Sequence, residues 1–373
     1  MAKHIYVHVP FCEAKCLYCS FFSCVNPSSV QDFFAAALRE LEVLDITEDQ
    51  NPDNKDTIYF GGGTPSSVDA NLVCDLLRAI LNKFDIDPNN SEITIEVNPH
   101  SLTMDKALAY REVGFNRVSM GVQSLHDSVL CTLGRLHDST LAKRAIVILK
   151  DAGFTNISCD LMLGIPGQTF EDLMEDARYL VSTGINHVSM YSLSIEEGTP
   201  FEKLYPHLDE VVDDELERKM YHGVRDYLNE CGIIPYEISN CGAPGYESVH
   251  NTAYWEGMEY YSIGAGSHGY IGGVRFCHEN SIEKYIENPL HTIVEETLFP
   301  EDKMREYAML RLRMTQGISR SRMKERFGVD LDDVYGETID KYVSDGFLAD
   351  DGESVFLTRK GLDYANIVFQ DFL

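Results

Sequence analysis

The chain contains no long hydrophobic run. No stretch of its 373 residues reaches the roughly 18 consecutive apolar residues of a membrane span. The first residues, MAKHIYVHVP, also lack the apolar segment and cleavage site of a secretory signal. We therefore expect no membrane span and a location in the cytoplasm.

Basic residues are scarce. The chain has 31 Lys and Arg against 60 Asp and Glu, which gives a formal net charge of −29. This charge repels the phosphates of nucleic acids and of anionic lipid headgroups. Nucleic-acid binding is therefore not expected as a main role.

The sequence also lacks the cysteine pattern of a disulfide-stabilised secreted domain. Ten cysteines are present, but seven are scattered along a long chain without secretory features. We expect these seven to be free thiols that mostly contribute to packing: Cys24, Cys74, Cys131, Cys159, Cys231, Cys241 and Cys277.

The other three cysteines form the most informative feature of the chain. The run HVPFCEAKCLYCS contains Cys12, Cys16 and Cys19, spaced so that one short loop can direct three thiolates to one point. Thiolates are the usual ligands of iron–sulfur clusters, and a four-iron cluster held by three cysteines leaves one iron for substrate or cofactor. The alternative is a zinc site with Cys24 or His8 as the fourth ligand. The spacing favours the cluster.

The length predicts about two domains, and the 44% hydrophobic content can fill a sizeable core. Short β-branched runs alternate with segments of helical period, which is typical of parallel strands joined by crossover helices. The predicted strands are 5–9, 57–60, 93–97, 117–122, 157–163 and 188–193. The predicted helices are 30–44, 71–83, 104–113, 140–152 and 170–182. These units predict an α/β fold, a partial (β/α)6 TIM-like barrel, whose chemistry gathers at the carboxyl ends of the strands.

Polar and glycine residues follow several of these strands. Gly62, Gly63 and Thr64 lie where backbone amides can approach a ligand, although a tight turn without ligand gives the same pattern. Glu96, Gln123 and Asp160 stand near the ends of the third, fourth and fifth strands. A single such acid is usually a surface residue, but several together indicate a pocket for a polar ligand.

The cysteine run, with Tyr18 before the third cysteine, resembles the signature of the radical S-adenosylmethionine (SAM) superfamily. The resemblance extends through IYFGGGTPS, ITIEVNP, VSMGVQSL, GRLH and DLMLGIPGQT, as in oxygen-independent coproporphyrinogen III oxidases and their relatives. It implies that Cys12, Cys16 and Cys19 ligate a 4Fe-4S cluster whose fourth iron is chelated by SAM. It also implies cofactor contacts for Tyr6, Tyr18, Gly62, Gly63, Thr64, Glu96, Gln123, Arg135 and Asp160.

The chemistry that this resemblance implies belongs to the cofactors. One electron from the reduced cluster cleaves SAM to methionine and a 5'-deoxyadenosyl radical, and an electron donor is then needed as a partner. A barrel interior shields such a radical from solvent. Glu96 or Asp160 can hold the ribose hydroxyls or the amino group of SAM, and Arg135 can pair with its carboxylate.

Two departures separate the chain from the true oxidases. Phe21 stands where those enzymes carry a further cysteine, and the chain begins almost at the first strand. The remaining pattern resembles the heme-chaperone branch, HemW, with Ser20 in place of its usual acid. The alternative is a coproporphyrinogen III oxidase or another porphyrin-directed radical SAM enzyme. A zinc-stabilised binding module is a third, non-heme class.

The segment HNTAYW matches the HNxxYW motif of that branch, which is associated with heme. It contains His250 and Trp255, the only tryptophan of the chain. Imidazole is a common axial ligand of heme iron, and aromatic side chains offer a flat apolar surface to a porphyrin. Without the resemblance, such a histidine is more often a packed loop residue. The resemblance predicts His250 as a heme-binding residue and a heme-acceptor protein as partner. His268, in IGAGSHG, lies on either a strand or a turn and receives no role.

The chain changes character after Pro300. Residues 303–314, 320–327 and 332–344 read as helices, a hairpin follows within 347–357, and a last helix starts at residue 360, the order of a winged-helix unit. Acidic residues dominate its third helix, which disfavours DNA and favours a structural or docking role. We predict two domains: residues 1–285, the barrel with its HNxxYW extension, and residues 300–373. The oligomeric state is left open.

Overall fold

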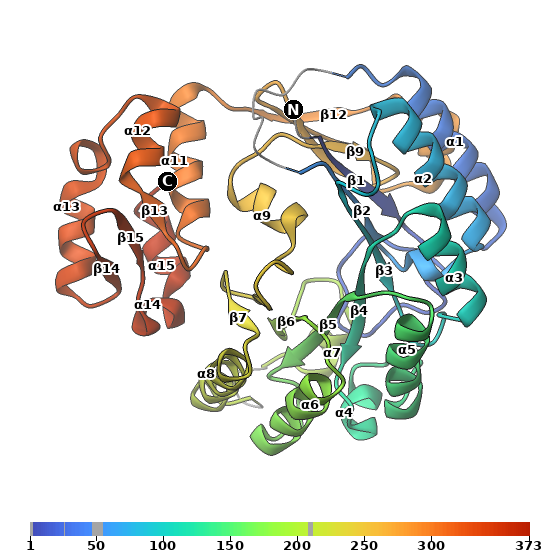
Figure 1. Ribbon diagram of the computed structural model, residues 1–373, viewed down its shortest axis with the longest axis horizontal. Coiled ribbons are helices and arrows are strands. Elements are labelled where there is room, and N and C mark those ends of the chain that lie inside the picture. The colour runs from blue at the N-terminus through green and yellow to red at the C-terminus, as the bar shows by residue number, and fades with distance from the viewer. Residues whose placement is uncertain (1–2, 26, 47–54, 208–211) are drawn as a thin grey trace.

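The computed structural model describes residues 3–25, 27–46, 55–207 and 212–373. In this part of the chain, six parallel strands lie side by side in chain order and form one curved sheet (Figure 1). These strands are β1 (His4–Val9), β2 (Thr57–Gly62), β3 (Glu92–Val97), β4 (Arg117–Gln123), β5 (Asn156–Leu163) and β6 (His187–Ser192). The predicted α/β partial barrel is confirmed, and each predicted strand corresponds to an observed one.

The sheet does not close into a full barrel, because β1 and β6, the outermost of the six strands, pair with different strands and not with each other. At one edge β9 (Tyr261–Ile263) pairs parallel to β1. At the other edge β8 (Asn240–Gly242) pairs antiparallel to β6, and β7 (Ile234–Pro235) follows. The barrel is therefore partial, with an opening on the side that faces the C-terminal part of the chain.

Amphipathic helices cover the outer face of the sheet. Most begin at a side-chain cap, such as Asp69, Thr103 or Asp138, each of which accepts a hydrogen bond from a backbone N–H of the first turn. Their buried faces pack on strand residues such as Ile58 and Val118, which are fully buried. These helices are α1 (Val30–Val43), α2 (Ala70–Phe84), α3 (Met104–Val113), α5 (Ser139–Asp151), α6 (Phe170–Ser182) and α8 (Asp214–Glu230). The short helices α4 (Asp127–Thr132) and α7 (Pro200–Leu204) belong to a separate cluster with Leu17 and Tyr18 of the cysteine loop.

The segment after the barrel adds a helix and a small sheet. Helix α9 (Val249–Trp255) lies between the main sheet and the C-terminal domain (Figure 1). A three-stranded antiparallel sheet follows, with β10 (His268–Ile271), β11 (Val274–Cys277) and β12 (Ile293–Thr297), and helix α10 (Ile282–Glu287) lies between its last two strands in the chain. His268 therefore lies at the start of a strand.

The C-terminal domain has its own core. Three helices, α11 (Pro300–Arg311), α12 (Arg320–Phe327) and α13 (Leu331–Ser344), pack on a small antiparallel sheet. That sheet contains β13 (Ile318–Ser319), β14 (Leu348–Asp350) and β15 (Ser354–Leu357), and α14 (Arg359–Asp363) and α15 (Ala365–Gln370) follow. This is the order expected for a winged-helix unit. The sequence missed the short β13, whose two residues carry no periodic signal.

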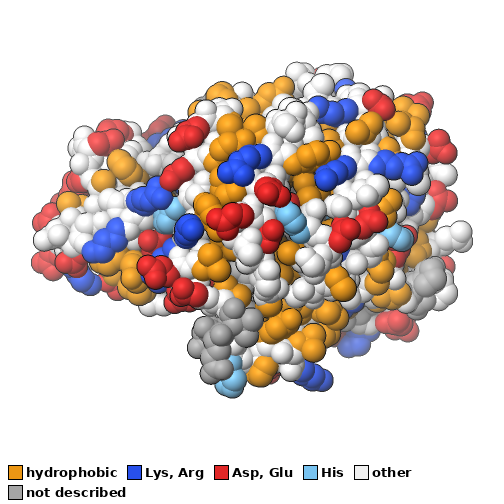
Figure 2. Space-filling model, turned by 90° about the horizontal axis from the view of Figure 1, so that it is seen from below, with side chains coloured by type: hydrophobic (Ala, Val, Ile, Leu, Met, Phe, Trp, Pro, Cys, Tyr) orange, Lys and Arg blue, Asp and Glu red, His pale blue; other side chains and the backbone are white. Residues whose placement is uncertain are grey.

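The surface shows no concentration of positive charge on the face drawn in Figure 2. Lys and Arg side chains are scattered there among acidic ones. No helix in the described ranges is both long and apolar enough to cross a bilayer.

Candidate functional site

The cysteine loop follows β1 directly and is closed by backbone hydrogen bonds. Cys12 N–H donates to Cys24 O at 3.0 Å, and Cys24 N–H donates to Pro10 O at 2.9 Å. A turn brings Cys19 back, with its N–H donating to Cys16 O at 3.3 Å. The three thiols Cys12, Cys16 and Cys19 are partly exposed at the carboxyl end of β1, as the sequence predicts.

The described structure shows no compact zinc-type group at these three thiols. Zinc holds sulfur at about 2.3 Å, so two sulfur ligands of one zinc lie at most about 4.6 Å apart. Among the described residues, one group of three possible metal ligands has donor atoms that all lie within 4.8 Å of one another. That group lies elsewhere in the molecule and contains none of these three cysteines. His8 is not a spare fourth ligand, because its ring nitrogens pair with Tyr6 OH at 3.1 Å and Phe22 O at 2.9 Å. A cluster held by the three cysteines stays a prediction from the sequence.

The glycine turn after β2 lies directly against the cysteine loop. Gly63 N–H donates to Val9 O at 3.0 Å, and Thr64 N–H donates to Phe11 O at 2.8 Å. The Thr64 hydroxyl lies 3.6 Å from Cys12 Sγ. A Cβ at Gly63 would lie 2.7 Å from the carbonyl oxygen of Phe11, so only glycine fits this close approach. The turn therefore fixes the position of the first cysteine.

Arg135 connects the loop to β4. Its guanidinium donates to Cys16 Sγ at 3.4 Å and to Gly121 O at 2.7 Å, while its Nε is buried without a partner. Gln123, in a register shift of β4, has φ of +65° and a buried Oε1 that is likewise unpartnered. Backbone strain and unpaired buried polar atoms are typical of ligand-binding sites.

Two buried acids lie on β3 and β5, the strands on either side of β4. Burial raises the pKa of Glu96 to about 7 and that of Asp160 to about 6. Glu96 accepts a hydrogen bond from Tyr59 OH at 2.7 Å, and Asp160 accepts one from Ser119 Oγ at 3.3 Å. A positively charged ligand between these carboxyl groups would favour their ionised forms.

The two predicted tyrosines also line this region. The Tyr6 ring stacks 6.2 Å from that of Tyr59, next to Glu96. Tyr18 packs on Phe201 and hydrogen-bonds Arg135, and its pKa is raised by burial. The structure therefore brings together the nine residues that the sequence assigned to the cofactor, whereas His250, assigned to heme, lies elsewhere.

His250 lies at the opposite end of the strands. Its Nδ1 pairs with the hydroxyl of Thr57, the first residue of β2, at 2.7 Å. Its Nε2 pairs with Tyr254 OH at 2.9 Å, and the side chain is only 1% exposed. The glycine turn is about five residues further along β2, which corresponds to about 16 Å at 3.3 Å per residue. Both ring nitrogens are therefore occupied, away from the cysteine loop.

Helix α9 is held in this place by a buried carboxylate that the sequence did not single out. Glu92, at the start of β3, accepts hydrogen bonds from the backbone N–H groups of Val249 at 3.0 Å and His250 at 2.9 Å. A carboxylate at the first turn of a helix satisfies otherwise unpaired donors. The signal available in the sequence was an acidic residue at the first position of a buried strand.

The other end of the HNTAYW segment reaches the C-terminal domain. The guanidinium of Arg313 lies 4.3 Å from the ring centre of Trp255. Trp255 Nε1 and Arg313 Nε are buried and have no hydrogen-bond partner in the described structure. The segment thus links the barrel interior to the second domain.

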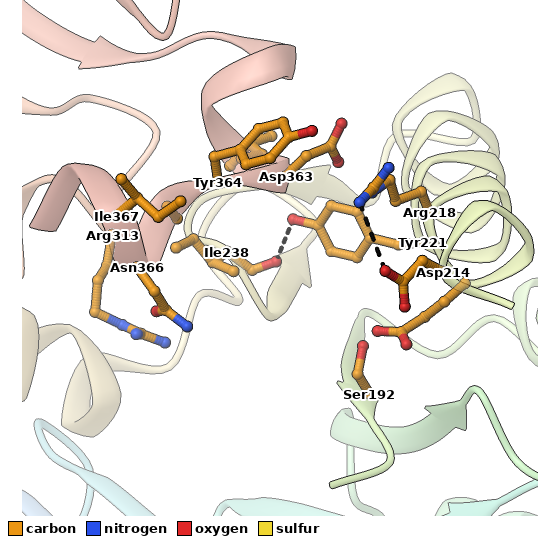
Figure 3. Close-up of a pocket in the computed structure, with 13 residues that line it drawn as sticks. Ser192, Asp214, Arg218, Tyr221, Ile238, Arg313, Asp363, Tyr364, Asn366 and Ile367 are labelled. Atoms are coloured by element: carbon orange, nitrogen blue, oxygen red, sulfur yellow. Dashed lines mark hydrogen bonds and ion pairs between the residues drawn. The ribbon is translucent and has the colours of Figure 1, made fainter. Parts of the chain in front are cut away.

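A cavity of about 530 Å³ lies between α8 and the C-terminal domain (Figure 3). Arg313 and Arg218 lie on opposite sides of it, and Tyr221 donates to Ile238 O at 2.8 Å along its wall. Ser192, at the carboxyl end of β6, borders it on the barrel side. This cavity could not be predicted from the sequence, because its residues come from distant parts of the chain.

Comparisons with known proteins identify the family of the chain. Residues 6–180 match the Radical SAM superfamily, and residues 298–364 match the HemN C-terminal domain. Heme chaperone HemW of Bacillus subtilis (strain 168) is 35% identical over 384 aligned positions, covering 100% of this chain and 99% of the relative. Heme chaperone HemW of Lactococcus lactis subsp. lactis (strain IL1403) is 33% identical, covering 99% and 96%.

A solved structure is similar over the whole chain. Coproporphyrinogen III oxidase (HemN) from Escherichia coli, described as a radical SAM enzyme, superposes with a TM-score of 0.81 at 18% identity. The match covers 100% of this chain and 90% of that chain. At this identity the likeness shows the shared fold.

Proposed function

Because this chain belongs to the family of the heme chaperone HemW, within the radical SAM superfamily, we propose that it binds heme and delivers it to acceptor proteins. The full-length similarity to HemW relatives carries this proposal. The superfamily implies a 4Fe-4S cluster and SAM as cofactors. The proposed setting is the cytoplasm, with a heme acceptor and an electron donor as partners.

The residues at the carboxyl end of the barrel fit the two cofactors. Cys12, Cys16 and Cys19 are the proposed cluster ligands, and Arg135 places a positive charge beside the Cys16 sulfur. The unpaired atoms of Gln123 and Arg135 offer an acceptor and a donor to a polar ligand. When bound, the reduced cluster supplies the electron that cleaves SAM.

The chain's own residues would position SAM. Glu96 and Asp160 supply negative charge for its amino group or sulfonium, and the Gly62, Gly63 and Thr64 turn offers backbone close to the cysteine loop. Tyr6, Tyr18 and the barrel wall limit the access of water, which strengthens these charge interactions.

The heme motif is separate from the cysteines but close to the proposed SAM pocket. His250 lies at the amino end of the strands, whereas the cysteines lie at the carboxyl end. The His250 ring stacks 5.1 Å from that of Tyr59, which donates to Glu96 at 2.7 Å, so a heme held through His250 would adjoin the pocket that contains Glu96. Axial ligation by His250 stays a prediction, and it requires that the hydrogen bonds to Thr57 and Tyr254 open.

Heme titration tests the proposal. The wild-type chain, loaded with its cluster under anaerobic conditions, should bind about one heme and show a histidine-ligated absorption spectrum. His250→Ala should lose that spectrum, and Tyr254→Phe should keep it, because the phenylalanine leaves Nε2 free. Equal and weak binding by the wild type and His250→Ala would count against the role of the motif.

The second candidate is a porphyrin-directed radical SAM enzyme, favoured by the overall likeness to coproporphyrinogen III oxidase. Phe21, at the position of a further cysteine in the true oxidases, argues against it. An anaerobic assay with coproporphyrinogen, SAM and reductant separates the two. Appearance of protoporphyrinogen would establish the enzyme instead.

A further inference from the structure

Three side chains of different chemistry meet on the small sheet that follows the barrel. His268 of β10, Cys277 of β11 and Glu295 of β12 have donor atoms that all lie within 4.8 Å of one another. His268 Nδ1 and Glu295 Oε2 are 2.9 Å apart. The function proposed above uses none of these residues.

The register of the sheet explains why the three meet. His268 and Cys277 are direct partners across β10 and β11, so their side chains stand on the same face. Where β11 pairs with β12, Arg275 is the partner of Glu296 and the next residue, Phe276, is the partner of Val294. Glu295 of β12 is therefore an extra residue between these two pairs. Such a bulge re-aims a side chain, and here it directs Glu295 toward the His268 and Cys277 pair.

The donor set selects the kind of ion. A thiolate and an imidazole bind zinc and similar borderline ions well, whereas Mg²⁺ and Ca²⁺ prefer oxygen ligands throughout. Ligands at about 2.0–2.3 Å from one zinc lie within about 4.6 Å of one another, which is comparable to the spacing of these three donor atoms. A heme iron offers one axial position on each face, so three donors on one side suit a bare ion better.

The surroundings are compatible with a cation. The site opens into a cavity of about 440 Å³ that also contains Glu279 and Lys284. The ammonium of Lys284 is paired with Glu279 at 2.7 Å, which offsets its charge. His268 and Glu295 are 58% and 40% exposed, so an ion can enter from solvent.

We propose that His268, Cys277 and Glu295 bind one Zn²⁺ ion, with a fourth coordination position open to water. The ion would join three strands of one sheet. Gly266, two residues before His268, lies against Phe22 of the cysteine loop, so the site adjoins the cofactor region without sharing its ligands.

The test uses the full-length chain with its cluster reconstituted and its iron content measured. The protein is equilibrated with buffered Zn²⁺, and zinc per chain and the zinc K-edge X-ray absorption spectrum are recorded. The zinc edge is independent of iron. We expect one zinc with one sulfur ligand at about 2.3 Å and two or three nitrogen or oxygen ligands at about 2.0–2.2 Å.

Variants identify the ligands. Cys277→Ser, His268→Ala and Glu295→Gln should each weaken zinc affinity, by about 100-fold or more for Cys277→Ser, since even outer-shell changes cost about 10–100-fold. Cys131→Ser and Glu296→Gln are matched controls and should keep the wild-type affinity. An unchanged iron content shows that each variant is folded.

Several results would overturn the proposal. Zinc held with several sulfur ligands would place it on the cluster cysteines. Zinc binding that survives all three ligand substitutions, or no zinc bound at about micromolar free Zn²⁺, would leave the three residues as a surface ion pair beside a thiol.

Discussion

Glu96 gives the cofactor pocket a dependence on pH. Its pKa is raised to about 7 by burial, so part of the population is protonated at neutral pH. A cationic ligand binds the ionised form better. The affinity for SAM should therefore rise with pH up to about 7, by tenfold per unit at most for one proton, and level off above.

Calorimetric titration with SAM between about pH 5.5 and 8.5 measures this profile. Glu96→Gln should weaken binding and flatten the rise, whereas the exposed Glu175→Gln should leave it unchanged. If Glu96→Gln binds SAM as tightly as the wild type at every pH, Glu96 does not belong to the SAM site.

Gly63 supports the cysteine loop through the absence of a side chain. Gly63→Ala places a Cβ 2.7 Å from the carbonyl of Phe11, a backbone atom that cannot move cheaply. We expect a loss of about 1–3 kcal/mol in stability and a lower iron content after reconstitution. Gly336→Ala, where a Cβ meets its nearest atom at 4.0 Å, is the control and should be neutral or slightly stabilising. Full iron loading of Gly63→Ala would contradict the close approach.

At the scale of single elements, α9 depends on buried hydrogen bonds. His250→Ala removes partners from Thr57 and Tyr254 and leaves a cavity, so we expect the free energy of unfolding to fall by about 2–4 kcal/mol. Thr57→Val should also destabilise, because the Thr57 hydroxyl pairs with both His4 at 2.8 Å and His250 at 2.7 Å and both buried histidines lose that partner. Thermal or denaturant unfolding of the apoprotein measures both changes. A fully stable His250→Ala would mean that the histidine serves binding alone.

Helix α1 is joined to the segment after β9 by a buried ion pair. Glu40 and His278 are 3.1 Å apart. Burial lowers the pKa of His278, but the hydrogen bond and charge of Glu40 outweigh burial, so the pKa is raised overall. The stabilising effect is therefore complete below the ordinary histidine pKa of about 6.5 and is lost as the pH rises through the raised value.

Unfolding experiments across this pH range test the pair. The wild-type chain should lose stability as the pH rises above about 6.5, and Glu40→Gln should be less stable at low pH and lack this slope. Parallel pH profiles of the two proteins would show that the pair is not ionised in the folded state.

The sequence predicted the elements better than the contacts between them. Strand and helix periods are local, so the six parallel strands and the cysteine loop after β1 were predictable. The environment of His250 was not, because it depends on Thr57, which lies 193 positions earlier in the chain. The bulge at Glu295 was likewise invisible, since it arises only when β11 and β12 pair.

At the scale of the whole molecule, Glu256 connects the two domains. This residue ends α9 and accepts charge-assisted hydrogen bonds from Arg311 at 2.6 Å and Arg322 at 3.2 Å. Arg311 is 2% exposed, so loss of its partner leaves a buried charge. Glu256→Gln should therefore lower the melting temperature and increase protease cleavage between the domains. The exposed Glu325→Gln is the control, and equal behaviour of the two variants would show that the domains are held by other contacts.

We propose that the protein is a cofactor-bearing carrier of heme that does not convert porphyrins. The most direct test incubates the cluster-loaded chain with SAM and reductant under anaerobic conditions, together with heme or coproporphyrinogen, and analyses the tetrapyrroles by chromatography. We predict that about one heme per chain stays bound and is recovered intact, while coproporphyrinogen is unchanged. Conversion of coproporphyrinogen to protoporphyrinogen, or breakdown of the heme, would contradict the claim.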